Sequence, residues 1–253
     1  MKWLLVIGLL TAPAAADSWR ETSKRFQGGG FLKYEVTGLH AVDDDPARMA
    51  AAAPDELVLT GVRMGAFVGA GAHVGYHLGV DLLAGSTIDK GGFAYDVALY
   101  PVGIASRFGH TGMVGIAMGI GASGAVGTLE DGAIVPVQTT LELGRGIRLL
   151  GRARVSYVLG AASRQSAAPN IPFADEFDAM LGIRLGRSYR HHGFPSGNGY
   201  FIAATYREQL GTRFVGVTLG YSLEAALPRR FLDDEERQRQ ERLERRRKRK
   251  RGR

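Results

Sequence analysis

The stretch "HVGYHLGVDL", residues 73–82, sorts its side chains into two rows when every second residue is read. Its even-numbered positions are all apolar, whereas its odd-numbered positions hold histidine, glycine or aspartate. A repeat of two residues is the period of a β-strand, because successive side chains point to opposite faces of a sheet. The stretch therefore predicts a strand with one apolar and one polar face, and the fold depends on which of these faces meets water.

The same alternation recurs along most of the chain. Further examples lie at 31–42, 113–123, 134–143, 149–159, 177–186 and 215–223. Segments rich in turn-forming residues separate them, and residues 57–225 hold no long run of helical periodicity free of glycines. We count nine strands from residue 57 onward and a tenth at 31–42. An eight-stranded arrangement, with one or two segments outside the wall, is the alternative.

The first residues have the three-part pattern of a secretory signal peptide. Lys2 precedes an apolar run at 3–10, and three alanines at 14–16 supply the small residues of a cleavage site. The run is too short for a membrane-spanning helix, which needs about 20 apolar residues. We expect four segments: a signal peptide at 1–16, a short N-terminal segment at 17–30, a barrel at 31–227 and a charged tail at 228–253.

Composition excludes some classes of site. The chain of 253 residues has no cysteine, which rules out disulfides, zinc–thiolate sites and cysteine nucleophiles. Its formal net charge of +7 resides mainly in residues 232–253, which carry eleven Lys or Arg and six acidic residues. The body of the protein is therefore close to neutral.

The polar row favours a membrane barrel over a soluble one. Exposed strands of soluble proteins carry Lys, Glu and Thr, whereas this row is largely glycine with single charges between. Glycine is a poor residue for an exposed strand, but inside a narrow barrel it leaves room for large side chains from neighbouring strands. We therefore expect the apolar row to face lipid and the other row to line a polar lumen.

This assignment names two sets of residues. The residues expected to line the lumen carry both signs of charge, as pairing in a buried site requires: Arg63, His77, Asp81, Asp96, Glu142, Arg152, Arg154, Asp178, Arg184 and Arg207. The residues expected to face lipid are Val74, Tyr76, Leu78, Val80, Val155, Tyr157, Val217, Leu219 and Tyr221. Tyrosines at 76, 95, 157, 200, 206 and 221 share the apolar faces, as aromatic girdles at the membrane interfaces do.

Three stretches, "HVGYHLGVDLL", "MVGIAMGIGASG" and "FVGVTLGYSLEA", resemble the strands of small Gram-negative outer-membrane β-barrel proteins. The resemblance spans residues 31–225. It implies an all-β fold, an antiparallel transmembrane barrel of 8–10 strands in the outer membrane, in contact with outer-membrane lipids and with the outer-membrane assembly machinery. The chain departs from the usual pattern in continuing well beyond its last strand.

Two sets of metal-binding residue types do not have the geometry of a metal site. His73, His77 and Asp81 are spaced by four residues, which on a strand is about 13 Å, too far for ligands of one ion. The acidic run at 43–45 lacks the spaced ligands of a calcium loop. We expect no metal and no cofactor.

We expect a structural or narrow, porin-like passive channel without catalysis. One alternative is a lipid-modifying barrel enzyme that uses His191 or His192, next to Ser196 in "RHHGFPSG". The other is a soluble periplasmic, lipocalin-like binder whose apolar row lines a ligand cavity.

The tail begins with acidic residues and ends with basic ones, which suits the dipole of a helix at both ends. Glu241 with Arg245 and Glu244 with Lys248 have the i,i+4 spacing of helical ion pairs. We expect a partly helical, solvated, periplasmic arm that contacts polyanions such as lipid phosphates, with no specific nucleic-acid partner.

The turns contain one conflict. With ten strands and a periplasmic N-terminus, "RHHGFPSGNG" (190–199) becomes a long periplasmic turn and "EQLGTR" (208–213) a short outer loop. Barrels of this class have short periplasmic turns and longer outer loops. The strand count, or a boundary near 188–198, is therefore expected to need correction.

Overall fold

The computed structural model of the chain describes residues 28–42, 54–69, 74–108, 112–126, 129–144, 147–159, 175–191, 194–209 and 212–226. These residues form ten strands. They are β1 (Gly28–Ala41), β2 (Glu56–Gly69), β3 (Val74–Thr87), β4 (Phe93–Phe108), β5 (Gly112–Ala125), β6 (Leu129–Gly144), β7 (Ile147–Leu159), β8 (Glu176–His191), β9 (Phe194–Gln209) and β10 (Thr212–Ala226). The described part of the chain includes no helix able to span a membrane.

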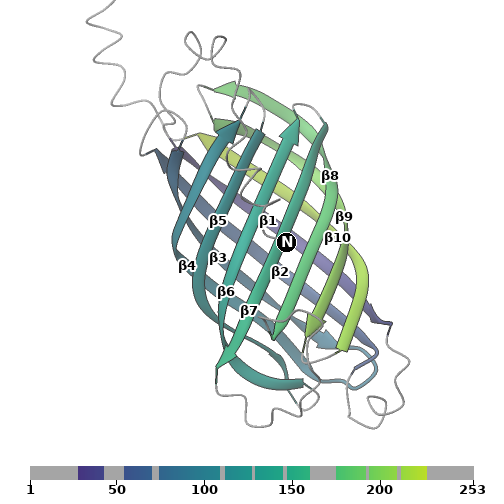
Figure 1. The fold of residues 1–253 in the computed structure, drawn as a ribbon. Coiled ribbons are helices and arrows are strands. Elements are labelled where there is room, and N and C mark those ends of the chain that lie inside the picture. Colours follow the sequence, from purple (N-terminus) through teal and green to yellow (C-terminus); the bar gives the residue numbers. More distant parts are fainter. Residues whose placement is uncertain are drawn as a thin grey trace, which may run out of the picture.

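The strands close into one antiparallel barrel in which each strand pairs with its neighbours in sequence, and β10 pairs with β1 (Figure 1). The closing pair is continuous from Gly29 opposite Ala226 to Ala41 opposite Phe214. Closure satisfies the backbone hydrogen-bonding groups of both edge strands, which a sheet in lipid requires. The ten-stranded, all-β expectation is confirmed, and the eight-stranded alternative is wrong.

The strands are longer than the 9–11 residues that a tilted membrane strand needs, since they run from 13 residues in β7 to 16 in β4. Figure 1 shows them steeply tilted around the barrel. A wall of this length extends beyond the hydrocarbon layer. The first strand begins at Gly28, within the segment expected to precede the barrel.

The conflict in the turns disappears with the observed boundaries. β8 continues to His191 and β9 starts at Phe194, so that most of "RHHGFPSGNG" is strand. Reading this stretch as a long turn is wrong, because Pro195, Gly197 and Gly199 lie in β9, which pairs with β8, rather than in a loop. The strand ends that flank the two longest connections, 42–55 and 160–175, lie at the end of the barrel opposite the start of β1 and the end of β10. We call that end the loop end, and the other the terminal end.

A bulge in β4 shifts the alternation part-way along the strand. The pairing of β4 with β5 changes register between Leu99 and Val102, where Pro101 interrupts the ladder. Proline has no N–H to donate, so it occurs in sheets at edges and bulges. Tyr100 points inward and is 1% exposed, whereas Val102 is 63% exposed. Even-numbered residues face inward before the bulge, and odd-numbered ones face inward after it.

Candidate functional site

The interior of the barrel holds the charged side chains. All ten residues expected to line the lumen lie on inner faces of strands, and none of their side chains is more than 9% exposed. Burial of this degree shows that they are packed against other side chains and do not border a wide aqueous channel.

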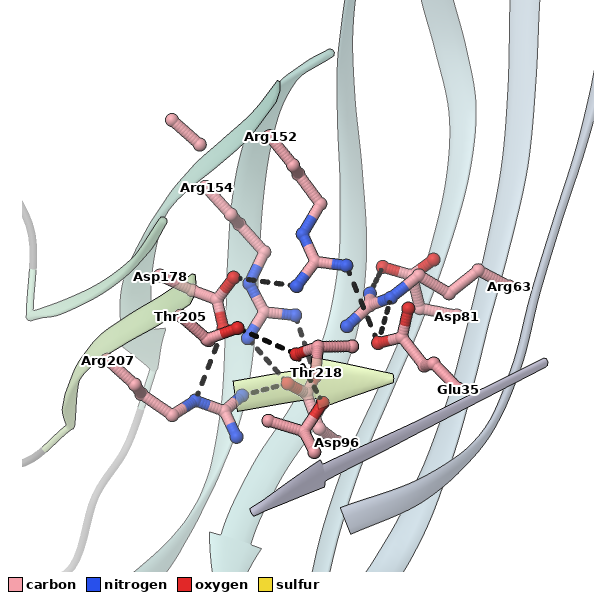
Figure 2. Close-up of polar contacts among 12 residues, drawn as sticks. Glu35, Arg63, Asp81, Asp96, Arg152, Arg154, Asp178, Thr205, Arg207 and Thr218 are labelled. Atoms are coloured by element: carbon pink, nitrogen blue, oxygen red, sulfur yellow. Dashed lines mark hydrogen bonds and ion pairs between the residues drawn. The ribbon is translucent and has the colours of Figure 1, made fainter. Parts of the chain in front are cut away.

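Eight of the interior charges form what we call the central cluster (Figure 2). Its members are Glu35, Arg63, Asp81, Asp96, Arg152, Arg154, Asp178 and Arg207. Four are arginines and four are carboxylates, so the cluster is neutral as a whole. Neutrality matters because an unpaired buried charge is strongly destabilising.

Arg63 on β2 joins the two strands beside it. Its Nε donates a hydrogen bond of 2.8 Å to Oε1 of Glu35 on β1, and its Nη1 pairs with Asp81 on β3. The hydroxyl of Tyr100 donates to the same aspartate over 3.3 Å. This half of the cluster therefore ties β1, β2, β3 and β4 together.

Asp96 on β4 receives two arginines from the far wall. Arg154 on β7 donates to both of its carboxylate oxygens, over 2.7 and 2.6 Å. Arg207 on β9 pairs with the same carboxylate. Charge-assisted pairs with two parallel bonds are among the strongest polar contacts in proteins. Asp96 thus fixes two side chains that cross the lumen.

Arg152 and Asp178 link the two halves of the central cluster. Nη2 of Arg152 lies 2.9 Å from Oδ1 of Asp178, and its Nη1 lies 3.6 Å from Oε1 of Glu35. Nε of Arg207 lies 3.6 Å from Oδ2 of Asp178. Figure 2 shows the guanidinium group of Arg152 between Asp178 on the left and Glu35 on the right. The result is one connected network across the barrel.

A second network, the terminal cluster, lies nearer the terminal end. Nζ of Lys33 on β1 lies 2.6 Å from Oε1 of Glu142 on β6, directly across the barrel. Arg148 lies 3.6 Å from Glu142 and 2.7 Å from Glu224, which also pairs with Arg184. Side chains again bridge opposite walls.

Apolar side chains fill the interior sector beneath the loop end. One buried cluster comprises Leu39, Leu57, Leu59, Leu83, Ala94, Ala125 and Phe214. These residues come from β1–β5 and β10, so one side of the interior is lined there by apolar side chains. Because small barrels are filled by side chains, this packing fits a ten-stranded wall.

The residues expected to face lipid lie on the outer wall. Val74, Tyr76, Leu78, Tyr157, Val217 and Leu219 are 43–61% exposed. Val80, Val155 and Tyr221 share that face but are half-buried between neighbouring side chains. The apolar row therefore lines no internal cavity, which argues against the lipocalin-like alternative.

Outward aromatic side chains gather at two levels. Tyr34, Tyr221 and Tyr200 are register neighbours on β1, β10 and β9, and the last two rings are 4.9 Å apart. At the loop end, Phe177 contacts Tyr206 with ring centroids 6.0 Å apart. In barrels that cross a membrane, tyrosines gather at two such levels, the membrane–water interfaces.

Several candidates lie outside what the structure describes. His73, His192 and the acidic run 43–45 are among the undescribed residues, as are segments 1–27 and 227–253. His191 and Ser196 lie on β8 and β9, but their side chains are not described. The alternative of a lipid-modifying enzyme therefore stays a prediction.

Sequence reasoning missed part of both clusters. Lys33, Glu35 and Glu224 make ion pairs as close as those of the expected residues. A signal for each was present, because Lys33 and Glu35 fall on the inward row of 31–42, and Glu224 continues the row of Thr218 and Ser222.

A closed antiparallel barrel with a charged interior, an apolar outer band and two aromatic levels is the architecture of proteins that cross the outer membrane as strands. The chain has the fold of an outer-membrane β-barrel protein.

No family model matches the chain, and no curated protein does. Among solved structures, it is similar to the β domain of the Bordetella autotransporter BrkA, with 13% identity over 78% of this chain and 98% of that one, at a TM-score of 0.39. It is also similar to outer membrane phospholipase A from Escherichia coli, with 9% identity over 79% of this chain and 97% of that one, at a TM-score of 0.36. A third similar structure is that of the Pseudomonas aeruginosa protein OccK5, with 6% identity over 80% of this chain and 99% of that one, at a TM-score of 0.19.

Proposed function

We propose that the protein is a sealed, non-catalytic barrel with a structural role in the outer membrane, rather than an open channel. The observation that carries this proposal is the crossing of the lumen by paired side chains. Asp96 with Arg207, and Lys33 with Glu142, each join strands that are separated by four others on either side.

The energetics of the network support a closed state. Opening a path through the central cluster would separate Arg154 and Arg207 from Asp96, and leave charges without partners in a site where each is less than a tenth exposed. Separating a buried pair is strongly unfavourable, so thermal motion alone does not open it. The proposal therefore excludes passage of hydrated ions and sugars at rest.

Solute exclusion tests the proposal. Purified full-length protein, reconstituted into vesicles that contain a small self-quenching dye, should release no more dye than empty vesicles do. Heat-modifiable mobility on gels reports in the same samples that the barrel is folded. Release that rises with the amount of folded protein would contradict the sealed barrel.

We further propose that the tail 228–253 contacts the anionic head groups of the leaflet at the terminal end. The tyrosine group of Tyr34, Tyr200 and Tyr221 supports an interface there, and β10 ends only five residues beyond Tyr221. Beyond that strand come Arg229 and Arg230 and then the basic run. Basic clusters next to a membrane-spanning segment bind anionic lipids.

A single engineered cysteine tests the tail, because the natural chain has none. A fluorophore on Gly252→Cys should transfer energy to acceptor lipids more efficiently in vesicles with phosphatidylglycerol than in pure phosphatidylcholine. High salt, or glutamine at every Lys and Arg of 245–251, should abolish the difference. Equal transfer in both vesicles would overturn this proposal, and leave the sealed barrel untouched.

A further inference from the structure

Buried polar atoms without a partner collect on one wall of the barrel. Among the described residues, these atoms include Nδ1 of His77, Oε1 of Gln138, Oγ1 of Thr140, Nε of Arg152 and Oγ of Ser156. Their burial is nearly complete: Ser156 is 0%, His77 2% and Gln138 6% exposed. Buried polar groups in native proteins are paired with protein or with ordered water. Five such atoms therefore indicate a common partner.

Four of the five lie in successive inward rows of β6 and β7. Thr140 pairs in register with Arg152, and the next inward row joins Gln138 to Arg154. Ser156 follows opposite Pro136, whose ring offers no N–H. Successive inward residues on a strand are about 7 Å apart. Two hydrogen bonds through one bridging water span at most about 6 Å, so each step from one row to the next needs one or two waters.

The fifth atom reaches the same wall from β3 across a glycine. Gly115 on β5 pairs in register with Thr140 and faces inward. A Cβ at this position would lie 2.8 Å from Oγ1 of Thr140 and 3.3 Å from Nδ1 of His77. The absent side chain therefore leaves the two polar atoms facing one space, with the ring of His77 held by stacking on Phe67 at 4.5 Å.

The other side of the interior differs in chemistry. The apolar cluster of β1–β5 and β10 includes Leu57 and Phe214, which are 1% and 0% exposed. The side chains of this cluster offer water no hydrogen bond. We therefore expect less hydration beside that cluster than along β6 and β7.

We infer that a file of ordered water molecules lies along the inner face of β6 and β7, and bonds the side chains of Thr140, Gln138 and Ser156 and, across Gly115, that of His77. The file runs beside the ion pairs of the central cluster and provides hydrogen-bond partners for polar atoms that those pairs do not contact. The inference goes beyond the proposed sealed barrel, because it assigns ordered water as a ligand of the barrel interior. Solute exclusion, by contrast, depends on the arginine–carboxylate pairs.

Radiolytic hydroxyl-radical footprinting of the full-length protein in detergent tests the inference, because radicals form from water bound next to a buried side chain. In the wild type, His77 should be oxidised many-fold faster than Phe214, although both are buried. In Gly115→Ala, oxidation of His77 should fall by more than half, because the new methyl group occupies the space of the water.

Gly38→Ala is the matched control, since a Cβ there meets nothing within 4 Å and lies on the outer face. It should leave oxidation of His77 unchanged. Should Gly115→Ala not fold, Thr140→Val removes one hydroxyl partner at nearly constant volume and should lower His77 oxidation in the same way. Oxidation of His77 no faster than that of Phe214, or unchanged in the folded variant, would overturn the water file. Dye release measured in parallel reports separately on the sealed barrel.

Discussion

Asp96 on β4 binds Arg207 on β9, the strand diametrically opposite in the ten-stranded ring. A contact of this kind exists only where side chains meet across the whole lumen. Because Arg154 binds the same carboxylate over 2.6 Å, Asp96 is the point at which three strands are joined inside the barrel.

Replacing Asp96 with alanine should therefore lower the free energy of unfolding by about 3–5 kcal/mol, since it leaves Arg154 and Arg207 buried without their shared partner. Urea unfolding of the barrel in lipid vesicles measures the change. Lys90→Gln, on the exposed turn after β3, is the control and should shift stability little. Equal stability of the Asp96→Ala variant and the wild type would show that the pairing contributes nothing.

The outer wall should not tolerate charge at mid-membrane depth. Leu219 lies near the middle of β10 and is 54% exposed. Leu219→Arg should reduce the free energy of unfolding by about 2–4 kcal/mol, whereas Val126→Arg, beyond the end of β5, should change it by about 0–1 kcal/mol. The same unfolding assay compares them. A larger effect at Val126 than at Leu219 would show that the hydrocarbon layer does not surround the middle of β10.

The closing seam between β1 and β10 leaves no room for a side chain at Gly216. A Cβ there would overlap the carbonyl oxygen of Gly38 and lie 2.9 Å from the Cα of Leu39. Backbone atoms cannot move aside cheaply, so Gly216→Ala should cost about 1–3 kcal/mol and lower the temperature at which heat-modifiable mobility is lost. Gly38→Ala should leave both the stability and that temperature unchanged. Similar behaviour of both variants would argue against this register.

The turn after β3 should loosen in acid. Slight burial raises the pKa of Asp89, but backbone N–H bonds from Asp55, at 3.0 Å, and Glu56, at 3.4 Å, outweigh it and hold the pKa below its ordinary value. A lowered pKa means that the contact is stabilising above about pH 4 and is lost as the pH falls through the lowered value. Hydrogen exchange at the amides of Asp55 and Glu56 should accelerate there, and Asp89→Asn should abolish that acid dependence. Exchange independent of pH, after correction for intrinsic rates, would contradict this.

Much of the barrel could be predicted from the alternation of side chains. The period of two in 73–82 decides that Val74 and His77 point to opposite faces, and the glycine-rich polar row indicates which face is inside. The strand count followed once the segment 31–42 was included. The boundary at 188–198 could not be read, because glycine and proline in a long strand look the same as in a turn.

The partners of the interior charges could not be predicted. Alternation shows that Asp96 and Arg207 both face inward, but their meeting depends on the stagger of ten strands around the ring, which no local pattern encodes. The bulge at Pro101 adds to this difficulty, because it reverses the inward parity of β4 part-way along. The sequence therefore indicates a charged interior, whereas the sealing network is visible only in the structure.

Planar-bilayer recording of the folded, full-length protein tests the sealed barrel most directly. Insertion is established from heat-modifiable mobility of the same preparation, and the current is recorded at about 1 M salt to reveal even a narrow pore. A sealed barrel should give a current no different from that of the bare bilayer. Regular, long-lived conductance steps that scale with the amount of inserted protein would contradict it.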